Sequence, residues 1–343
     1  MSTAIGFREF FEARHRNGDL VVFPTGMGSE ISALGAKLTP PYETRLPLWS
    51  GSALLDERGR ELVRQVHLNA IQLGGTDIIT TNTWARPTAF KCVADNWQAA
   101  AHDAFRHGVR IAVDVKKQIR RETGRNIYVG GSFGPLMDSH EYHAERALSM
   151  NDLLKTHRDT AQALVDAASN DLDFLIPETA CSADEAWAMA WAASITNRPF
   201  ILGLTPGVNG DLRDGTKLER IIADVSRMKG FTAIAFNCIE TACVKNALNK
   251  IGFYEGPIVI YANGHGKPGA DGTWQFDNSA EAVASFSETA LSWAMREKNI
   301  VGLGGCCGTL SHSYGQHLNS TIQAERQRRF ACQEVPRRHY AAG

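Results

Sequence analysis

The stretch Ile300-Val301-Gly302-Leu303-Gly304-Gly305-Cys306-Cys307 is a short apolar run that ends in glycines and two adjacent cysteines. Its length and composition are typical of a buried strand. Nearly every other apolar run in the chain also ends in a cluster of small or polar residues. These clusters are Thr25-Gly26-Met27-Gly28, Thr80-Thr81-Asn82-Thr83, Gly131-Ser132-Phe133-Gly134-Pro135, Glu178-Thr179, Asn237-Cys238 and Asn263-Gly264-His265.

The apolar runs predict eight strands separated by helical segments. The segment 151–168, for example, carries apolar residues at helical spacing and predicts an amphipathic helix. Eight strands with helical crossovers predict an α/β fold of the (β/α)8 TIM-barrel type, in which all carboxyl ends of the strands face one active-site surface. A doubly wound open sheet also alternates strand and helix and is the alternative. The predicted strands are 20–23, 77–81, 127–130, 174–177, 200–204, 233–237, 258–261 and 300–303.

The chain of 343 residues is 43% hydrophobic and contains no linker of low complexity. We therefore expect one domain over 1–343, with the barrel core at about 15–325 and a basic C-terminal tail. A short basic terminus is usually a solvated helix or a subunit contact, so a homo-oligomer stays open. The basic residues of the tail are Arg326, Arg328, Arg329, Arg337 and Arg338.

Composition also limits the partners and the compartment. The formal net charge is −1 with acidic and basic residues interspersed, which argues against nucleic-acid and membrane partners. No apolar stretch has the length of a signal peptide or a membrane span. Seven cysteines without regular spacing argue against a disulfide framework. We expect a cytoplasmic protein that acts on small molecules.

Three cysteines predict a metal site. Adjacent cysteines do not easily bond to each other, whereas Cys306 and Cys307 with Cys238 fit three corners of a zinc tetrahedron. The fourth corner can take an incoming thiol, which loses its proton and becomes a nucleophile. Adjacent cysteines could also be inert core, because cysteine is among the most buried residue types, but the flanking glycines favour a metal.

Two further clusters predict substrate contacts. Glu178 closes the apolar run 174–177, where a carboxylate needs a charged partner, either a ligand or a basic residue of the barrel. The turn at Gly26 and Gly28 could offer backbone N–H groups to an anion such as a substrate carboxylate.

Several blocks together, in order from about residue 20 to residue 320, resemble the homocysteine S-methyltransferase family. This family includes S-methylmethionine- and betaine-dependent enzymes and the first module of cobalamin-dependent methionine synthase. The resemblance implies a zinc-bearing barrel with Cys238, Cys306 and Cys307 as catalytic ligands, and Glu178 as the partner of the homocysteine amino group. The blocks are Gly26-Met27-Gly28-Ser29-Glu30, Leu48-Trp49-Ser50, 75–83, 131–135, Glu178-Thr179, Asn237-Cys238 and Gly304-Gly305-Cys306-Cys307.

The sequence departs from the family at two positions. Thr25 stands where most members carry an acidic residue that helps hold the amino group, and Gly308 stands where many carry arginine. A charge-assisted hydrogen bond is worth roughly 1.5 to 3 kcal/mol, so homocysteine could bind weakly or another thiol could be the acceptor.

The methyl donor is predicted from aromatic residues in the expected mouth loops. Aromatic faces hold sulfonium and quaternary ammonium groups by cation–π attraction, which favours an onium donor. We expect His265 to contact ligand, and Thr81, Asn82 and Ser132 to orient substrate or loops. The aromatic residues are Trp49, Trp84, Tyr42 and Trp274.

The sequence therefore predicts a zinc-dependent thiol S-methyltransferase that transfers a methyl group from a sulfonium or betaine-like donor to homocysteine and forms methionine. One alternative is methyl transfer or demethylation with a different donor and acceptor, including a corrinoid partner. Another alternative is a non-catalytic zinc- or thiol-binding barrel. A hydrolytic metal barrel is disfavoured, since no His-x-His pair ends an early strand.

Overall fold

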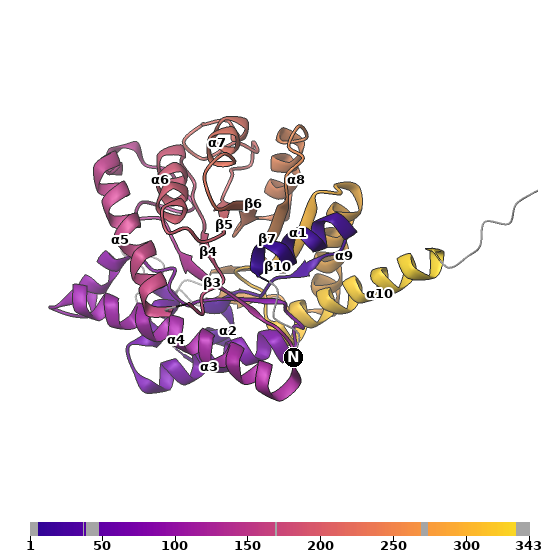
Figure 1. The fold of residues 1–343 in the computed structure, drawn as a ribbon, viewed down its shortest axis with the longest axis horizontal. Helices are drawn as coiled ribbons and strands as arrows, with labels where there is room; N and C mark the ends of the chain where they lie inside the picture. The colour runs from indigo at the N-terminus through magenta and orange to yellow at the C-terminus, as the bar shows by residue number, and fades with distance from the viewer. Residues whose placement is uncertain (1–5, 37, 39–47, 169, 269–273, 334–343) are drawn as a thin grey trace, which may run out of the picture.

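The computed structural model describes residues 6–36, 38, 48–168, 170–268 and 274–333. Its main sheet has eight parallel strands in the spatial order β1, β10, β7, β6, β5, β4, β3, β2 (Figure 1). β8 (Gly266–Pro268) and β9 (Trp274–Phe276) form a separate antiparallel pair. The strands of the main sheet are β1 (Val21–Val22), β2 (Ile78–Thr80), β3 (Tyr128–Phe133), β4 (Phe174–Pro177), β5 (Phe200–Leu204), β6 (Phe231–Asn237), β7 (Ile258–Ala262) and β10 (Ile300–Gly305).

Asp77 joins the two ends of this sheet. Its backbone N–H donates to the carbonyl of Val22 in β1 (2.9 Å), and its carboxylate accepts from the Val22 N–H (3.0 Å). Because Asp77 directly precedes β2, these bonds bring β1 and β2 together and nearly close a barrel. The strands follow one another in chain order around it, whereas a doubly wound sheet reverses its order at a switch point. The predicted (β/α)8 barrel is confirmed, as a single domain.

Helices connect the strands and cover the outside of the barrel (Figure 1). The predicted helix over 151–168 corresponds to α5. The α-helices are α1 (Phe7–Asn17), α2 (Met27–Ala33), α3 (Glu57–Gln72), α4 (Trp97–Thr123), α5 (Met150–Ala168), α6 (Ala183–Ser194), α7 (Leu218–Val225), α8 (Thr241–Lys250), α9 (Ala280–Arg296) and α10 (Gln316–Gln333). Short 3-10 turns are η1 (Trp49–Leu54), η2 (Pro87–Cys92) and η3 (Ala144–Arg146), and η4 (Ser311–Gly315) is a π-turn.

Helix α1 fills the amino-terminal end of the barrel. Phe7 and Phe11 of α1 are buried in the same cluster as the inward-facing side chains of the strands. The ring of Phe7 stacks on Phe174 of β4 at 4.0 Å between centroids. Burying one such ring contributes about 1.5 to 3 kcal/mol. With this end filled, the carboxyl ends of the strands are left to build a site.

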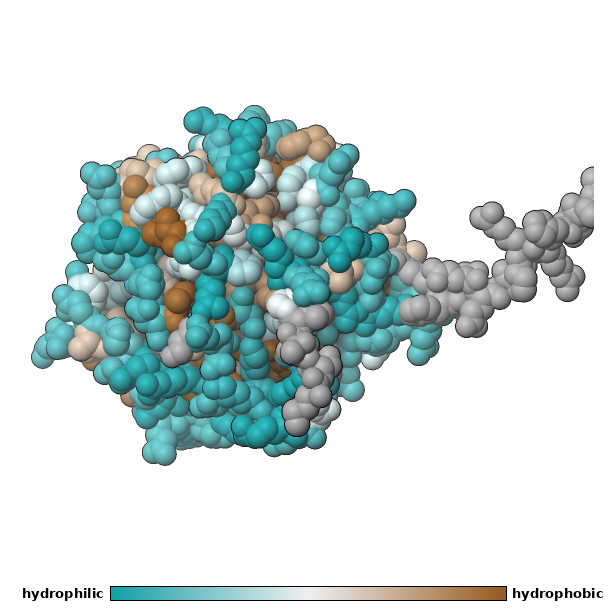
Figure 2. Space-filling view, viewed as in Figure 1, coloured by the Kyte–Doolittle hydropathy of each residue, from teal (hydrophilic) through white to brown (hydrophobic). Residues whose placement is uncertain are grey.

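The surface carries hydrophilic residues over most of the face seen in Figure 2. Within the described ranges, no helix combines the length and the hydrophobicity that crossing a membrane requires. Of the predicted basic tail, Arg326 forms an ion pair with Asp19 (2.8 Å), which holds α10 against the barrel. Arg337 and Arg338 lie outside the described residues.

Candidate active site

A pocket opens at the carboxyl ends of the strands, where the sequence pattern predicts the site. Its lining comes from the segments after β1, β2, β3, β4, β6 and β10, together with Tyr261 of β7. Residues far apart in the sequence therefore share one cavity. Among the predicted site residues, those that line it are Thr25, Gly26, Gly28, Trp49, Glu178, Cys238, Cys306 and Cys307.

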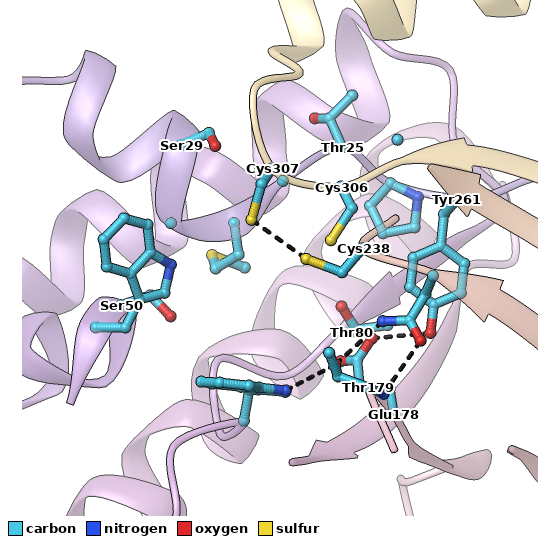
Figure 3. Close-up of a pocket in the computed structure, with 18 of the residues that line it drawn as sticks. Thr25, Ser29, Ser50, Thr80, Glu178, Thr179, Cys238, Tyr261, Cys306 and Cys307 are labelled. Atoms are coloured by element: carbon cyan, nitrogen blue, oxygen red, sulfur yellow. Dashed lines mark hydrogen bonds between the residues drawn. The ribbon is translucent and has the colours of Figure 1, made fainter. Parts of the chain in front are cut away.

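The three cysteines meet in this pocket, and their sulfur atoms point into one space (Figure 3). All three Sγ atoms lie within 4.8 Å of one another, and those of Cys238 and Cys307 are 3.5 Å apart. The neighbouring Cys238 thiol, burial and the Glu178 carboxylate raise the pKa of Cys306 well above its usual range. Three thiolates can coexist here when a cation compensates their charge, so the donor set fits a metal ion.

The segment after β1, which includes the first turn of α2, holds the turn that carries Cys306 and Cys307. The Ser29 hydroxyl accepts from the N–H of Gly308 (2.9 Å), and the Glu30 carboxylate accepts from the N–H of Ser311 (2.7 Å). The N–H of Gly26 donates to the hydroxyl of Thr309 (3.1 Å). Gly308 itself has φ +78°, a backbone conformation that suits glycine. The segment between β1 and the middle of α2 thus fixes the turn after β10 that carries the two cysteines.

Only glycine fits at position 26, because the backbone of Cys306 lies against it. A Cβ on Gly26 would lie 2.3 Å from the carbonyl oxygen of Cys306, so the backbone must move. We expect Gly26→Ala to weaken metal affinity about tenfold by displacing the cysteine turn. Competition with a chelator measures this. Gly6→Ala is the control, because Gly6 also caps the start of a helix with a similar backbone and a Cβ there has no neighbour within 4 Å among the described residues. Equal metal affinity in wild type and Gly26→Ala would contradict the prediction.

Glu178 lies at the end of β4 and is held by two hydroxyl groups. The Tyr261 hydroxyl donates to its Oε2 (2.8 Å; Figure 3), and the Ser132 hydroxyl donates to its Oε1. Burial raises the pKa of Glu178, and these two bonds act against that rise by favouring the carboxylate. The orientation of the carboxylate is therefore set before a ligand arrives.

Two tryptophans contribute aromatic surface to the pocket, and we call them the aromatic wall. Trp49 and Trp84 both line the pocket. The indole N–H of Trp84 donates to the Thr179 hydroxyl (3.0 Å). A Cβ on Gly28 would lie 2.2 Å from the indole nitrogen of Trp49, so glycine leaves room for this ring. Tyr42 and the side chain of Trp274, expected in the same role, lie outside the described residues.

His140 is a further residue of the site, and the sequence pattern does not indicate its position. This side chain lines the pocket, and its Nε2 lies 3.0 Å from the carbonyl oxygen of Cys238. The loop after β3, which carries His140, is held by Glu185 of α6. The buried carboxylate of Glu185 accepts from the N–H of Leu136 (2.8 Å) and lies 2.6 Å from the ring nitrogen of His157. Glu185 in the alanine-rich segment 183–194 is the signal that could have pointed to this anchor.

A model of the homocysteine S-methyltransferase family matches residues 21–313. The chain belongs to this family. The homocysteine S-methyltransferase of Escherichia coli (strain K12) is 26% identical over 300 residues, which cover 85% of this chain and 92% of the relative. The selenocysteine methyltransferase of Astragalus bisulcatus is 26% identical over 322 residues, which cover 86% of this chain and 90% of the relative.

A crystal structure has a similar fold. The metallated form of the homocysteine methyltransferase MmuM from Escherichia coli matches with a TM-score of 0.68 at 23% identity, and the match covers 88% of this chain and 96% of that chain. The predicted resemblance to the homocysteine S-methyltransferase family is confirmed, and with it the prediction that the chain is a methyltransferase.

The remaining predicted site residues of this family member lie around or beyond the pocket. Asn82 donates to the carbonyl of Ser50 (2.9 Å), and Ser132 contacts Glu178, so both lie one layer behind the lining. His265 is exposed and does not line the pocket. Thr25, by contrast, lines the pocket, and its hydroxyl lies 3.0 Å from that of Ser311.

Proposed function

We propose that this homocysteine S-methyltransferase family member transfers a methyl group from an onium donor, a sulfonium or betaine-like compound, to the sulfur of homocysteine, with zinc as its metal. The observation that carries the proposal is the set of ionisable side chains that line the pocket. Three thiol groups and Glu178 line it, and among the described lining residues none is lysine or arginine. Such a pocket favours cationic groups on both substrates.

Zinc fits the donor set. Zn–S bonds are about 2.3 Å long in tetrahedral sites, which places two sulfur ligands about 3.8 Å apart. The Sγ atoms of Cys238, Cys306 and Cys307 lie within 4.8 Å of one another and need only small adjustments to reach that spacing. Bound there, zinc supplies Lewis acidity that ionises a substrate thiol well below the free thiol's pKa of about 8.5.

We assign the homocysteine amino group to Glu178. Its carboxylate is oriented by Ser132 and Tyr261 and keeps lone pairs for an ammonium group. The N–H of Gly26 is already used by Thr309, so the substrate carboxylate is left to backbone N–H groups of the turn at Gly28.

The indoles of Trp49 and Trp84 are assigned to the donor. An onium methyl carbon against these faces is attracted by the ring quadrupoles. In the transfer, the acceptor sulfur forms a bond to the methyl carbon while the bond from that carbon to the donor's positive sulfur or nitrogen breaks, and its electron pair stays on the leaving atom. Holding the two substrates in line can lower the barrier by about 7 to 11 kcal/mol.

A donor panel tests this assignment. Zinc-replete protein is incubated with homocysteine and S-methylmethionine, S-adenosylmethionine, glycine betaine or dimethylsulfoniopropionate, and methionine is measured by mass spectrometry. We expect methionine from an onium donor, and we expect Trp49→Leu to raise the KM of that donor about 5- to 30-fold, since a desolvated cation–π contact is worth about 1 to 2 kcal/mol.

Trp97→Leu is the control, because Trp97 lies on α4 and contacts Lys91 outside the pocket. If Trp49→Leu left the KM of the donor unchanged, the aromatic wall would not bind the donor. If zinc-loaded protein forms no methionine from any of the four donors, the onium assignment fails, and a corrinoid donor or a different acceptor takes its place.

Thr25 favours a second candidate, a thiol acceptor other than homocysteine, for methyl transfer or demethylation of a natural donor. Its hydroxyl faces Ser311 and supplies no negative charge, so one carboxylate serves the amino group instead of two. A non-catalytic barrel would bind homocysteine without turnover. A cytoplasmic location, assembly with copies of itself and the core bounds of about 15–325 stay predictions.

A further inference from the structure

We propose that Thr179 is a positioning residue whose hydroxyl links the metal-ligand segment at Asn237 to the aromatic wall at Trp84. The inference rests on the proposed function, because it assigns the wall to the donor. Thr179 and Asn237 are parts of sequence motifs whose chemistry is otherwise carried by their neighbours, Glu178 and Cys238.

The backbone of Thr179 is in an unusual conformation. Its φ is +72°, in the left-handed region that a β-branched residue rarely occupies. Four non-glycine residues of the described ranges have positive φ, and three of them line the pocket, namely Trp49, Thr179 and Cys238. Conformations of this kind persist where surrounding contacts hold them, and three hydrogen bonds hold Thr179.

Asn237 supplies two of these contacts. Its Oδ1 accepts from the Thr179 N–H (3.1 Å), and its Nδ2 donates to the Thr179 hydroxyl oxygen (3.1 Å). Both side chains are buried, with exposed fractions of 1% for Asn237 and 3% for Thr179. A Cβ on Gly203 would lie 2.6 Å from Asn237 Oδ1, so glycine at this position leaves space for the amide. Asn237, the residue directly before Cys238, is thus held by two hydrogen bonds to Thr179.

Trp84 supplies the third contact. Its indole N–H donates to the same hydroxyl oxygen at 3.0 Å (Figure 3). A hydroxyl oxygen has two acceptor lone pairs, and Asn237 and Trp84 use both. A Cβ on Gly134 would lie 2.6 Å from the indole nitrogen, so the ring packs tightly against the β3 loop. The Thr179 hydroxyl oxygen therefore fixes the position of the Trp84 ring relative to the segment that ends in Cys238.

Removing this oxygen leaves two donors of the site without an acceptor while sparing the groups proposed to bind metal and homocysteine. Cys238, Cys306, Cys307 and Glu178 make no side-chain hydrogen bond to Thr179 among the described contacts. We therefore expect the loss to affect donor binding and the transfer step, and to leave metal content and acceptor affinity unchanged.

The experiment compares Thr179→Val, which keeps the shape and removes the hydroxyl, with Thr179→Ser, which keeps the hydroxyl. Protein labelled with 5-fluorotryptophan gives a ¹⁹F resonance for Trp84, assigned by its absence in Trp84→Phe. We expect Thr179→Val to shift or broaden this resonance and to lower kcat/KM for the onium donor about tenfold or more, because two hydrogen bonds are lost. Zinc content and the homocysteine Kd should stay within about twofold of wild type.

The Ser variant should restore the resonance and recover kcat/KM to within about threefold of wild type. Thr205→Val is the matched control, because Thr205 is fully buried, its hydroxyl has no partner among the described residues, and it does not line the pocket. Should Thr179→Val fail to fold, Trp84→Phe removes the same hydrogen bond from the other side and should lower kcat/KM for the donor.

An unchanged Trp84 resonance in Thr179→Val would overturn the inference, as would a Ser variant no better than Val, or a Trp84→Phe variant with wild-type kinetics. The failure of the proposed function is separate. If wild type turns over no onium donor but the Trp84 resonance still responds to Thr179→Val and recovers in Thr179→Ser, the positioning role stands and the donor assignment falls.

Discussion

Cys307→Ala is expected to abolish metal binding and methyl transfer together. Cys307 lies 3.5 Å from Cys238 between their sulfur atoms, so its removal opens a second corner of the cluster. Without the metal, a substrate thiol of pKa about 8.5 is only about 3% ionised at pH 7. Losing its placement against the methyl carbon adds a factor of about 100, so turnover should fall by more than about 1000-fold.

Metal content by atomic emission and methionine formation by mass spectrometry measure the two losses on the same preparation. Cys306→Ala should behave alike. Cys243→Ala is the matched control, because Cys243 is a buried cysteine of α8 outside the cluster and should keep both properties. If either cluster variant kept full turnover, metal activation of the acceptor would have to be abandoned.

Glu178→Gln is expected to raise the KM for homocysteine while metal stays bound. The amide keeps the size of the side chain but cannot attract an ammonium group by charge. A hydrogen bond to a charged group is worth about 1.5 to 3 kcal/mol, which corresponds to about 10- to 150-fold in affinity. Thr25 supplies no second charge, so we expect the upper part of this range.

Calorimetric titration of the zinc-loaded protein with homocysteine gives the affinity directly. Tyr261→Phe provides a graded comparison, since it removes only the hydroxyl that orients Glu178 (2.8 Å) and should weaken binding about threefold to tenfold. Loss of zinc from Glu178→Gln would show that Glu178 belongs to the metal site instead of the acceptor site.

Much of the fold was predictable because each strand leaves a local pattern. The apolar run 174–177 coincides with β4, and the run 200–204 coincides with β5. The cysteine cluster was predictable because few arrangements explain adjacent cysteines after a strand. What local patterns do not encode is contact between distant segments. The closure of the barrel through Asp77 is one such contact, and the reach of His140 to Cys238 is another.

The glycine turn illustrates the same limit. Its sequence suggested that the N–H of Gly26 is free for an anion, but the N–H donates to Thr309, which lies 283 positions away in the chain. The role of Thr179 could not be predicted for the same reason. Its hydroxyl has hydrogen-bond partners only because the fold brings Asn237 and Trp84 to it.

The contacts between the segments after β1 and after β10 have a consequence for folding during synthesis. β1 pairs with β10, and the turn that carries Cys306 and Cys307 is hydrogen-bonded to Ser29 and Glu30. The geometry of this turn therefore forms only after β10 has paired with β1. A nascent chain that has left the ribosome up to β7 carries Cys238 but neither of its partners. The three sulfur atoms can therefore come together only after β10 has been synthesised and has paired with β1 and β7, so a metal ion bound there would connect the segment after β6 to the segment after β10.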